Sequence, residues 1–169
     1  MAQKFTSSAT SINSTKLPAV YRKAPLSAGL VMDYGCGKYT DHIRDYVSNA
    51  HRVYLPFDPY NQPEERNALT ASYVINAMHA RYPVDVVCSN VLNVIDDDDT
   101  VRKIARQIEE ITTASGGTGY VTVYEGNRSG IGRQTGADQY QRNAVLRDYL
   151  RFFRNARVKN GMIIVKGVQ

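Results

Sequence analysis

The chain has 169 residues, of which 43% are hydrophobic and 22% are charged, and this is the balance of one soluble globular domain. The sequence has no apolar run long enough to cross a bilayer, and its first residues lack the apolar core of a secretion signal, so we expect a cytoplasmic protein with no membrane partner. The two cysteines and three histidines have the spacing of neither a disulfide framework nor a metal site, so no metal is expected.

The net charge of +5 is distributed unevenly along the chain. Residues 1–30 carry four Lys or Arg and no acid, residues 31–126 carry eight basic and fourteen acidic residues, and residues 127–169 carry nine basic and two acidic ones. Because clustered positive charge gains affinity for phosphates by releasing counterions, this asymmetry favours a nucleic acid or another anionic partner. A charged surface that only keeps the protein soluble is the alternative.

Residues 1–27 are rich in Ser, Thr, Ala and Lys and are interrupted by Pro18 and Pro25. This composition predicts an irregular arm with one short helix. The arm either frays in solution or covers a bound ligand as a lid.

A short apolar run that ends in an acid and two glycines, at residues 31–37, is the stretch around which the chain is organised. Val31 and Met32 end a buried strand, and Gly35 and Gly37 let the backbone approach a ligand without an intervening Cβ. Residues 39–47 then predict a helix whose N-terminal amides face whatever lies over the glycines. The pattern predicts a Rossmann-like, doubly wound and mostly parallel sheet in three α/β/α layers, although a glycine pair alone is also typical of a tight turn without a ligand.

A second predicted strand, at residues 51–57, ends at Asp58. An acid at this distance from the glycines reaches the hydroxyls of a ribose in nucleotide-binding folds. Pro63 suits the first turn of a further helix. The stretch 68–80 is ambiguous, and residues 72–75 have the pattern of a short third strand followed by a helical turn.

The clearest strand pattern is that of residues 83–88, after which Ser89 and Asn90 appear where the chain leaves the sheet. Four aspartates at residues 96–99 precede an amphipathic helix over residues 101–111. Acids at the positive end of a helix dipole stabilise it, so capping explains the aspartates better than a metal site does.

A fifth predicted strand, at residues 120–124, delivers Glu125 to the same edge of the sheet as the glycines. The loop at residues 126–137 holds four glycines and two arginines, and its length is typical of a functional or mobile loop. Residues 138–154 predict a helix with a basic stripe that faces either a phosphate backbone or water, formed by Arg147, Arg151 and Arg154. Residues 161–166 predict the final strand.

Four features together resemble the class I S-adenosylmethionine-dependent methyltransferases. They are residues 33–37, Asp58, residues 88–90 and the helix–Gly–Gly–strand element before Tyr120. The resemblance covers residues 28–126 and is greatest to small, stand-alone members of bacterial and phage type. It implies a seven-stranded sheet with an antiparallel last strand, of which six strands are recognisable. The single domain then divides into the arm (1–27), a cofactor-binding core (28–126), and an acceptor loop, basic helix and last strand (127–169).

The resemblance implies S-adenosyl-L-methionine as the cofactor and S-adenosyl-L-homocysteine as its product. The glycine turn would pack against the methionine portion, Asp58 would bond the ribose hydroxyls, and Ser89 and Asn90 would lie beside the methyl donor. The cofactor-binding residues that it implies are Asp33, Tyr34, Gly35, Cys36, Gly37, Asp58, Pro59, Ser89, Asn90 and Val91.

On the acceptor side we expect Asn90 to orient the acceptor and Glu125 to act as a base or an orienting group. A purely structural role for Glu125 at the end of a strand is an equal alternative. Tyr124, Arg128 and Arg133 are the expected substrate-binding residues.

The sequence departs from the family pattern at the glycine turn and after residue 88. Tyr39 stands where the family often has a third glycine. The segment after residue 88 lacks the Asp/Asn-Pro-Pro-Tyr signature of amino-directed DNA methyltransferases, and no Pro-Cys pair marks a cytosine nucleophile. We therefore expect Cys36 and Cys88 to be packing residues.

The sequence predicts a methyltransferase that acts on a nucleic acid or another anionic acceptor. The alternatives are a methyltransferase for a small molecule, a protein that binds or consumes S-adenosylmethionine without methyl transfer, and a dinucleotide oxidoreductase. We expect no separate target-recognition domain at this chain length, which argues against sequence-specific reading of DNA. The oligomeric state is open.

Overall fold

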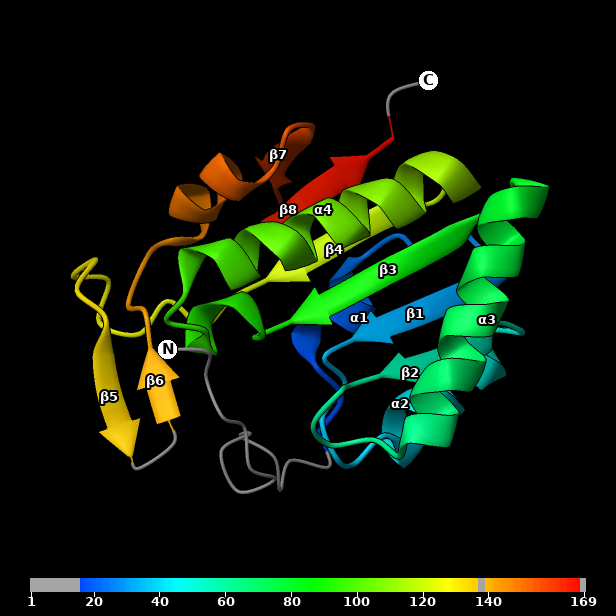
Figure 1. Cartoon of the computed structure of the whole chain (residues 1–169), viewed down its shortest axis with the longest axis horizontal. Coiled ribbons are helices and arrows are strands. Elements are labelled where there is room, and N and C mark those ends of the chain that lie inside the picture. The colour runs from blue at the N-terminus through cyan, green and yellow to red at the C-terminus, as the bar shows by residue number, and fades with distance from the viewer. Residues whose placement is uncertain (1–15, 137–138, 168–169) are drawn as a thin grey trace.

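Six strands form one mixed, mostly parallel sheet in the order β2-β1-β3-β4-β8-β7 (Figure 1). The computed structural model describes residues 16–136 and 139–167. Strands β1 to β4 are parallel, and β8 runs antiparallel between β4 and β7. The strands are β1 (Leu30–Tyr34), β2 (Val53–Phe57), β3 (Val84–Ser89), β4 (Thr118–Thr122), β7 (Ala156–Lys159) and β8 (Met162–Lys166).

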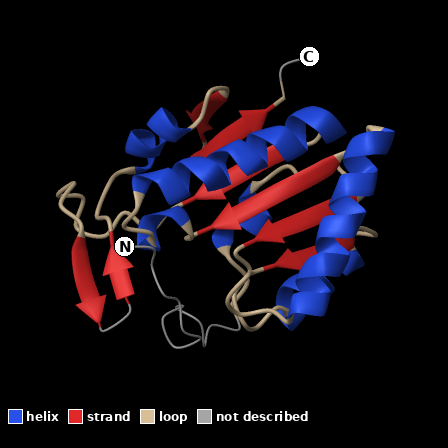
Figure 2. Ribbon diagram, viewed as in Figure 1, coloured by secondary structure: helices blue, strands red, loops and turns tan. Residues whose placement is uncertain are grey.

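Helices cover both faces of this sheet, as expected of a Rossmann-like α/β fold (Figure 2). The helices α3 (Glu64–Ala80) and α4 (Asp98–Ser115) pack on one face. The helices α1 (Ala19–Lys23) and α2 (Asp41–Asn49) pack on the other. Residues 84–88 of β3 are all buried, because this central strand is covered on both sides.

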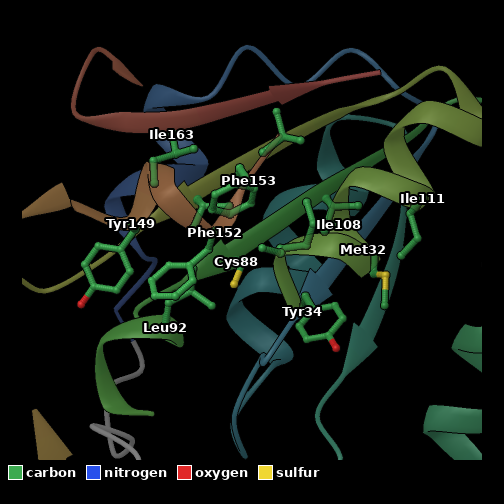
Figure 3. Close-up of a cluster of buried hydrophobic side chains, with 14 of the residues drawn as sticks. Met32, Tyr34, Cys88, Leu92, Ile108, Ile111, Tyr149, Phe152, Phe153 and Ile163 are labelled. Atoms are coloured by element: carbon green, nitrogen blue, oxygen red, sulfur yellow. The ribbon is translucent and has the colours of Figure 1, made fainter. Parts of the chain in front are cut away.

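Side chains on the two faces of the sheet enter two separate apolar clusters. The larger cluster lies under α3 and α4 and extends to the 3₁₀ helix η2 (Leu146–Phe152), as Figure 3 shows. Met32, Cys88 and Ile163 belong to it, whereas Val31, Val87 and Ile164 belong to the cluster under α1 and α2. Full burial of a Val or Ile side chain stabilises the fold by roughly 1.5–3 kcal/mol, so the clusters hold the sheet in place.

Residues 72–75, which the sequence suggested as a third strand, lie within α3. The buried residues of α3 are Thr70, Val74 and Ala77, at helical spacing. The β-branched residues Val74 and Ile75 locally favour a strand, but the packing of the buried stripe on the sheet makes this segment a helix. The six strands of the sheet therefore include β7 in place of the suggested third strand.

The predicted helix over residues 138–154 is confirmed only in part, as the 3₁₀ helix η2. A hairpin of β5 (Arg133–Gly136) and β6 (Gln139–Gln141) is followed by residues 142–145, which form neither helix nor strand, and then by η2. The N–H of Arg142 donates to the carbonyl of Asn93 at 2.8 Å, and Asn143 has a φ of 55°, so this segment does not continue as a helix. Arg147, Arg151 and Arg154 are all exposed, but only the first two lie on η2, and Arg151 also pairs with Asp98. The basic stripe is therefore not the face of a single helix.

The described part of the arm confirms one short helix, α1, whose Val20 and Tyr21 are buried against the sheet. The other residues expected in the arm, 1–15, lie outside the described residues. Among the described residues, no helix has both the length and the apolarity needed to cross a membrane.

Asp85 holds the amino-terminal edge of the sheet together. Its fully buried carboxylate accepts hydrogen bonds from the backbone N–H groups of Ser27 (2.7 Å), Ala28 (2.9 Å) and Thr118 (3.0 Å). One side chain thus joins the segment before β1, the centre of the sheet and the start of β4.

We predict that Asp85→Asn lowers the free energy of unfolding by about 2–3 kcal/mol, because the amide keeps one acceptor oxygen and places an NH₂ group against backbone donors. Urea unfolding measures this change. Asp45→Asn is the matched control, since Asp45 is exposed and should change the stability by less than about 0.5 kcal/mol. Equal effects of the two substitutions would contradict this account.

Candidate functional site

A cavity of about 850 Å³ lies at the carboxyl ends of β1, β2 and β3. Its walls are the loops that follow these strands, part of α4, and the segment 16–18 ahead of α1. In a parallel α/β sheet, ligands bind outside the carboxyl ends of the strands. The cavity is lined by all ten residues expected at the cofactor: Asp33, Tyr34, Gly35, Cys36, Gly37, Asp58, Pro59, Ser89, Asn90 and Val91.

The glycine turn is fixed to the end of β2. The N–H groups of Gly35 and Cys36 donate to the carbonyl of Phe57 at 2.7 and 3.2 Å. Gly35 and Gly37 have φ values of 78° and 74°, which L side chains rarely adopt. A Cβ on Gly35 would lie 2.4 Å from the Val91 side chain, whereas one on Gly37 would meet no atom within 4 Å. At Gly37 the turn therefore presents a bare backbone surface to open space, whereas Val91 packs on Gly35.

Asp58 is buried, and both its carboxylate oxygens have partners in the chain. Oδ2 accepts from the Gly37 N–H at 2.9 Å, and Oδ1 accepts from the N–H groups of Tyr60 and Asn61 at 2.9 and 3.0 Å. The Asn61 side-chain amide bonds to both oxygens at 3.2 Å, and the buried Asn61 Oδ1 has no partner among the described residues. Asp58 thus organises the two loops that meet at the cavity.

Asp33 is the second buried carboxylate at this edge. Burial raises its pKa to about 6, against the lowering effect of the Tyr54 hydroxyl, which donates to Oδ2 at 2.7 Å. The charge of Asp58 adds to the rise. Above that pH, a buried anion stands behind the glycine turn and favours a positively charged group in the cavity.

The two cysteines have the environment expected of packing residues. Burial raises the pKa of Cys36 and of Cys88 well above the usual range of a thiol. Both remain neutral at physiological pH, which makes them poor nucleophiles.

Tyr34 is held by packing and by one polar contact. Its ring lies 5.2 Å from the ring of Phe57, and its hydroxyl donates to Gln107. Figure 3 shows it within the larger apolar cluster.

The residues after β3 differ in their roles. Ser89 accepts from the Thr122 hydroxyl at 3.2 Å, and the exposed Asn90 has a φ of 58° with its N–H bonded to the Thr122 carbonyl. Asn93, which the sequence analysis missed, lies in η1 (Leu92–Val94), is 2% exposed and lines the cavity. Its only signal in the sequence is a polar residue inside an otherwise apolar run.

Glu125 is held by structural contacts. Its Oε1 accepts from the Leu146 N–H at 2.8 Å, and its Oε2 lies 2.7 Å from Nε of Arg128. Neither Glu125 nor Arg128 is among the described residues that line the cavity, whereas the exposed Tyr124 is. Arg133 lies on β5 and lines a smaller cavity of about 400 Å³.

Several cavity residues were not predicted from the sequence, because they lie on helix faces or in loops with no distinctive motif. They include basic, aromatic and amide side chains: Lys38, Tyr39, His42, Tyr60, Asn61, Asn93, Lys103, Gln107 and Gln141.

The aspartates before α4 cap the helix as expected. Asp97 Oδ2 accepts from the Thr100 N–H at 2.8 Å, and Asp98 pairs with Arg142 at 2.6 Å. Within residues 16–136 and 139–167, no group of three or more His, Cys, Asp or Glu side chains is placed to hold a metal ion.

Comparisons with known proteins identify no relative of this chain. No protein family matches it, and neither the curated proteins nor the solved structures contain a significant match.

The raised pKa of Asp33 predicts a pH dependence of stability. Between about pH 4, where this carboxyl titrates in the unfolded chain, and about pH 6, the folded state binds more protons, so the free energy of unfolding falls as pH rises. The fall is up to about 3 kcal/mol and ends above the folded pKa.

Urea unfolding from about pH 4 to about pH 7 should show that Asp33→Asn removes this part of the pH dependence. Asp41→Asn, at an exposed position, serves as the control and should leave it unchanged. Parallel curves for wild type and Asp33→Asn would contradict the assignment.

Proposed function

We propose that this protein is an S-adenosylmethionine-dependent methyltransferase whose cofactor binds in the 850 Å³ cavity. The observation that carries the proposal is the convergence of three separate sequence segments, around Gly35, Asp58 and Asn90, on one cavity at the carboxyl edge of a parallel sheet. The antiparallel strand β8 between β4 and β7 also agrees with the antiparallel last strand that the resemblance implies.

The residues present fit the cofactor in shape and charge. The open space over Gly37 accommodates a ligand that approaches the backbone closely. Asp33 and Asp58 supply negative charge on the same wall, which suits the cationic groups of the cofactor. Val91, Ile95 and Ile104 supply apolar surface for its adenosine portion, and Lys38 and Lys103 supply positive charge for its carboxylate.

Asp58 would bond the ribose hydroxyls only after a small rearrangement. Its shorter bonds to backbone N–H groups hold the two loops together, whereas the two bonds to the Asn61 amide are longer, at 3.2 Å. The two neighbouring ribose hydroxyls would replace the Asn61 amide more easily than they would replace the backbone N–H groups. The Asn61 side chain, whose Oδ1 lacks a partner among the described residues, is then free to bond elsewhere.

The chain's own residues have mainly to align the acceptor and exclude water. The bound cofactor supplies a methyl group on a positively charged sulfur, which leaves as a neutral thioether when the acceptor's lone pair forms the new bond. Asn90, beside the cavity, orients the acceptor. Glu125 acts as a positioning residue, because it fixes the start of η2 and the loop bearing Arg128.

The acceptor side favours an anionic molecule or a nucleic acid. The segment beyond β4 brings the exposed Arg133 to the smaller cavity, beside Tyr124. A methyltransferase for a small molecule remains the second candidate, because this smaller cavity is itself large enough for a modest ligand.

Binding of S-adenosylhomocysteine tests the site. Gly37→Ala should weaken binding about ten-fold or more in calorimetry, because its Cβ fills the open space over the turn. Gly161→Ala is the matched control. Gly161 has a φ of 70° and open space around it but lies in the β7–β8 turn, so the same backbone strain of about 1 kcal/mol should leave binding unchanged. Binding of NAD with none of S-adenosylhomocysteine would contradict the proposal and favour an oxidoreductase.

Transfer of labelled methyl groups tests the reaction itself. Single-stranded DNA, RNA and a small-molecule cell extract serve as separate acceptor pools, with wild type compared with Gly37→Ala and Gly161→Ala. We expect label in a nucleic-acid pool, lost with Gly37→Ala and kept with Gly161→Ala. Label only in the extract would favour a small acceptor, and cofactor binding without label in any pool would favour a sequestering protein.

A further inference from the structure

The smaller cavity adjoins the proposed cofactor cavity. The two share Val94, Tyr124 and Gln141 as lining residues. The smaller one lies between the β5–β6 hairpin and the end of β4, on the side toward which the strands β1 to β4 point in Figure 1. A group bound there would lie next to a ligand in the larger cavity.

A chain of hydrogen bonds at this junction fixes the orientation of two amide side chains. Gln141 Nε2 donates to the Tyr124 carbonyl at 2.8 Å, so Gln141 Oε1 must point to the other side. That oxygen accepts from Asn93 Nδ2 at 3.1 Å. Flipping either amide would place two acceptors or two donors together, so Asn93 Oδ1 is fixed as an acceptor.

Asn93 Oδ1 is buried and has no hydrogen-bond partner among the described residues. The Asn93 side chain lines the larger cavity, and its partner Gln141 lines both. A buried acceptor without a donor costs roughly as much as a lost hydrogen bond. A ligand that offers an N–H at the junction would remove that cost.

The other groups at the smaller cavity suit a planar base with a phosphate. Tyr124 is 64% exposed and lines both cavities, so its ring is available for stacking. Arg133 brings a guanidinium, which pairs with phosphate in a bidentate way. The remaining described lining is mostly neutral amide and hydroxyl side chains.

We propose that the smaller cavity is the acceptor subsite and that it binds a nucleotide. The base stacks on Tyr124 at the junction of the two cavities and directs an amino N–H to Asn93 Oδ1 on the side of the larger cavity, while the phosphate pairs with Arg133 in the smaller one. This assignment rests on the methyltransferase function proposed above. A free nucleotide and a nucleotide within a single strand share this chemistry, and the test separates them.

Binding is measured with S-adenosylhomocysteine present at saturation. The probes are AMP, CMP, GMP and UMP in calorimetry, and short fluorescent single-stranded DNA and RNA oligonucleotides in anisotropy. We expect a nucleotide with an exocyclic amine to bind more tightly than UMP, or oligonucleotides bearing such bases to bind more tightly than oligo-U. If the oligonucleotides bind and the monophosphates do not, the ligand is a nucleotide within a single strand. If both bind, a free nucleotide is sufficient.

Tyr124→Ala and Arg133→Gln should each weaken nucleotide binding about ten-fold, while Tyr124→Phe keeps the stacking ring and retains it. Tyr73→Ala and Arg157→Gln are matched exposed controls on α3 and β7 and should have no effect. Arg133→Gln, Tyr73→Ala and Arg157→Gln should bind S-adenosylhomocysteine as wild type does, because none of these three residues lines the larger cavity.

Wild-type protein that binds S-adenosylhomocysteine but no nucleotide probe would overturn the subsite and leave the proposed function standing. Equal losses in the variants and their controls would also overturn it. No binding of S-adenosylhomocysteine by wild type would instead be a failure of the proposed function.

Discussion

The structure of the site depends on the hydrogen bonds that tie the glycine turn after β1 to the end of β2. The carbonyl of Phe57 accepts from two successive amides of the turn, and Asp58 accepts from the N–H of Gly37. This geometry requires positive φ at Gly35 and Gly37, and it leaves open space over Gly37, whereas the Val91 side chain lies over Gly35. The loops after β1 and β2 are therefore fixed relative to each other. Val91, in the loop after β3, packs against Gly35 of the glycine turn.

The two cavities differ in chemistry because different parts of the chain build them. The larger one is bordered by β1, β2 and β3, and its buried carboxylates Asp33 and Asp58 make it suitable for a ligand with positive charge. The smaller one depends on the segment after β4, which Glu125 anchors through Leu146 and Arg128. A cofactor with positive charge would suit the larger cavity, and an anionic acceptor would suit the smaller one.

Strands β1, β2, β3, β4 and β8 and the glycine turn were predictable because their signals are local: buried apolar runs, and glycines or acids where a strand ends. The α4 caps were predictable for the same reason. Strand β7 was missed because none of its residues is fully buried. Strands β5 and β6 and residues 142–145 were not predictable, since a long-range bond from Arg142 to Asn93 fixes where this segment lies. The helical stripe of Thr70, Val74 and Ala77 likewise overrode a β-branched stretch. Asn93 was missed because its role depends on a hydrogen bond to Gln141, 48 positions further along the chain, and no local sequence pattern indicates this bond.

A crystal structure with S-adenosylhomocysteine would test the central claim most directly. The account predicts the homocysteine portion against the bare backbone of Gly35 to Gly37, the ribose near Asp58, and the Asn61 amide displaced from that carboxylate. A ligand bound elsewhere on the protein, or a glycine turn left empty at saturating ligand, would contradict it.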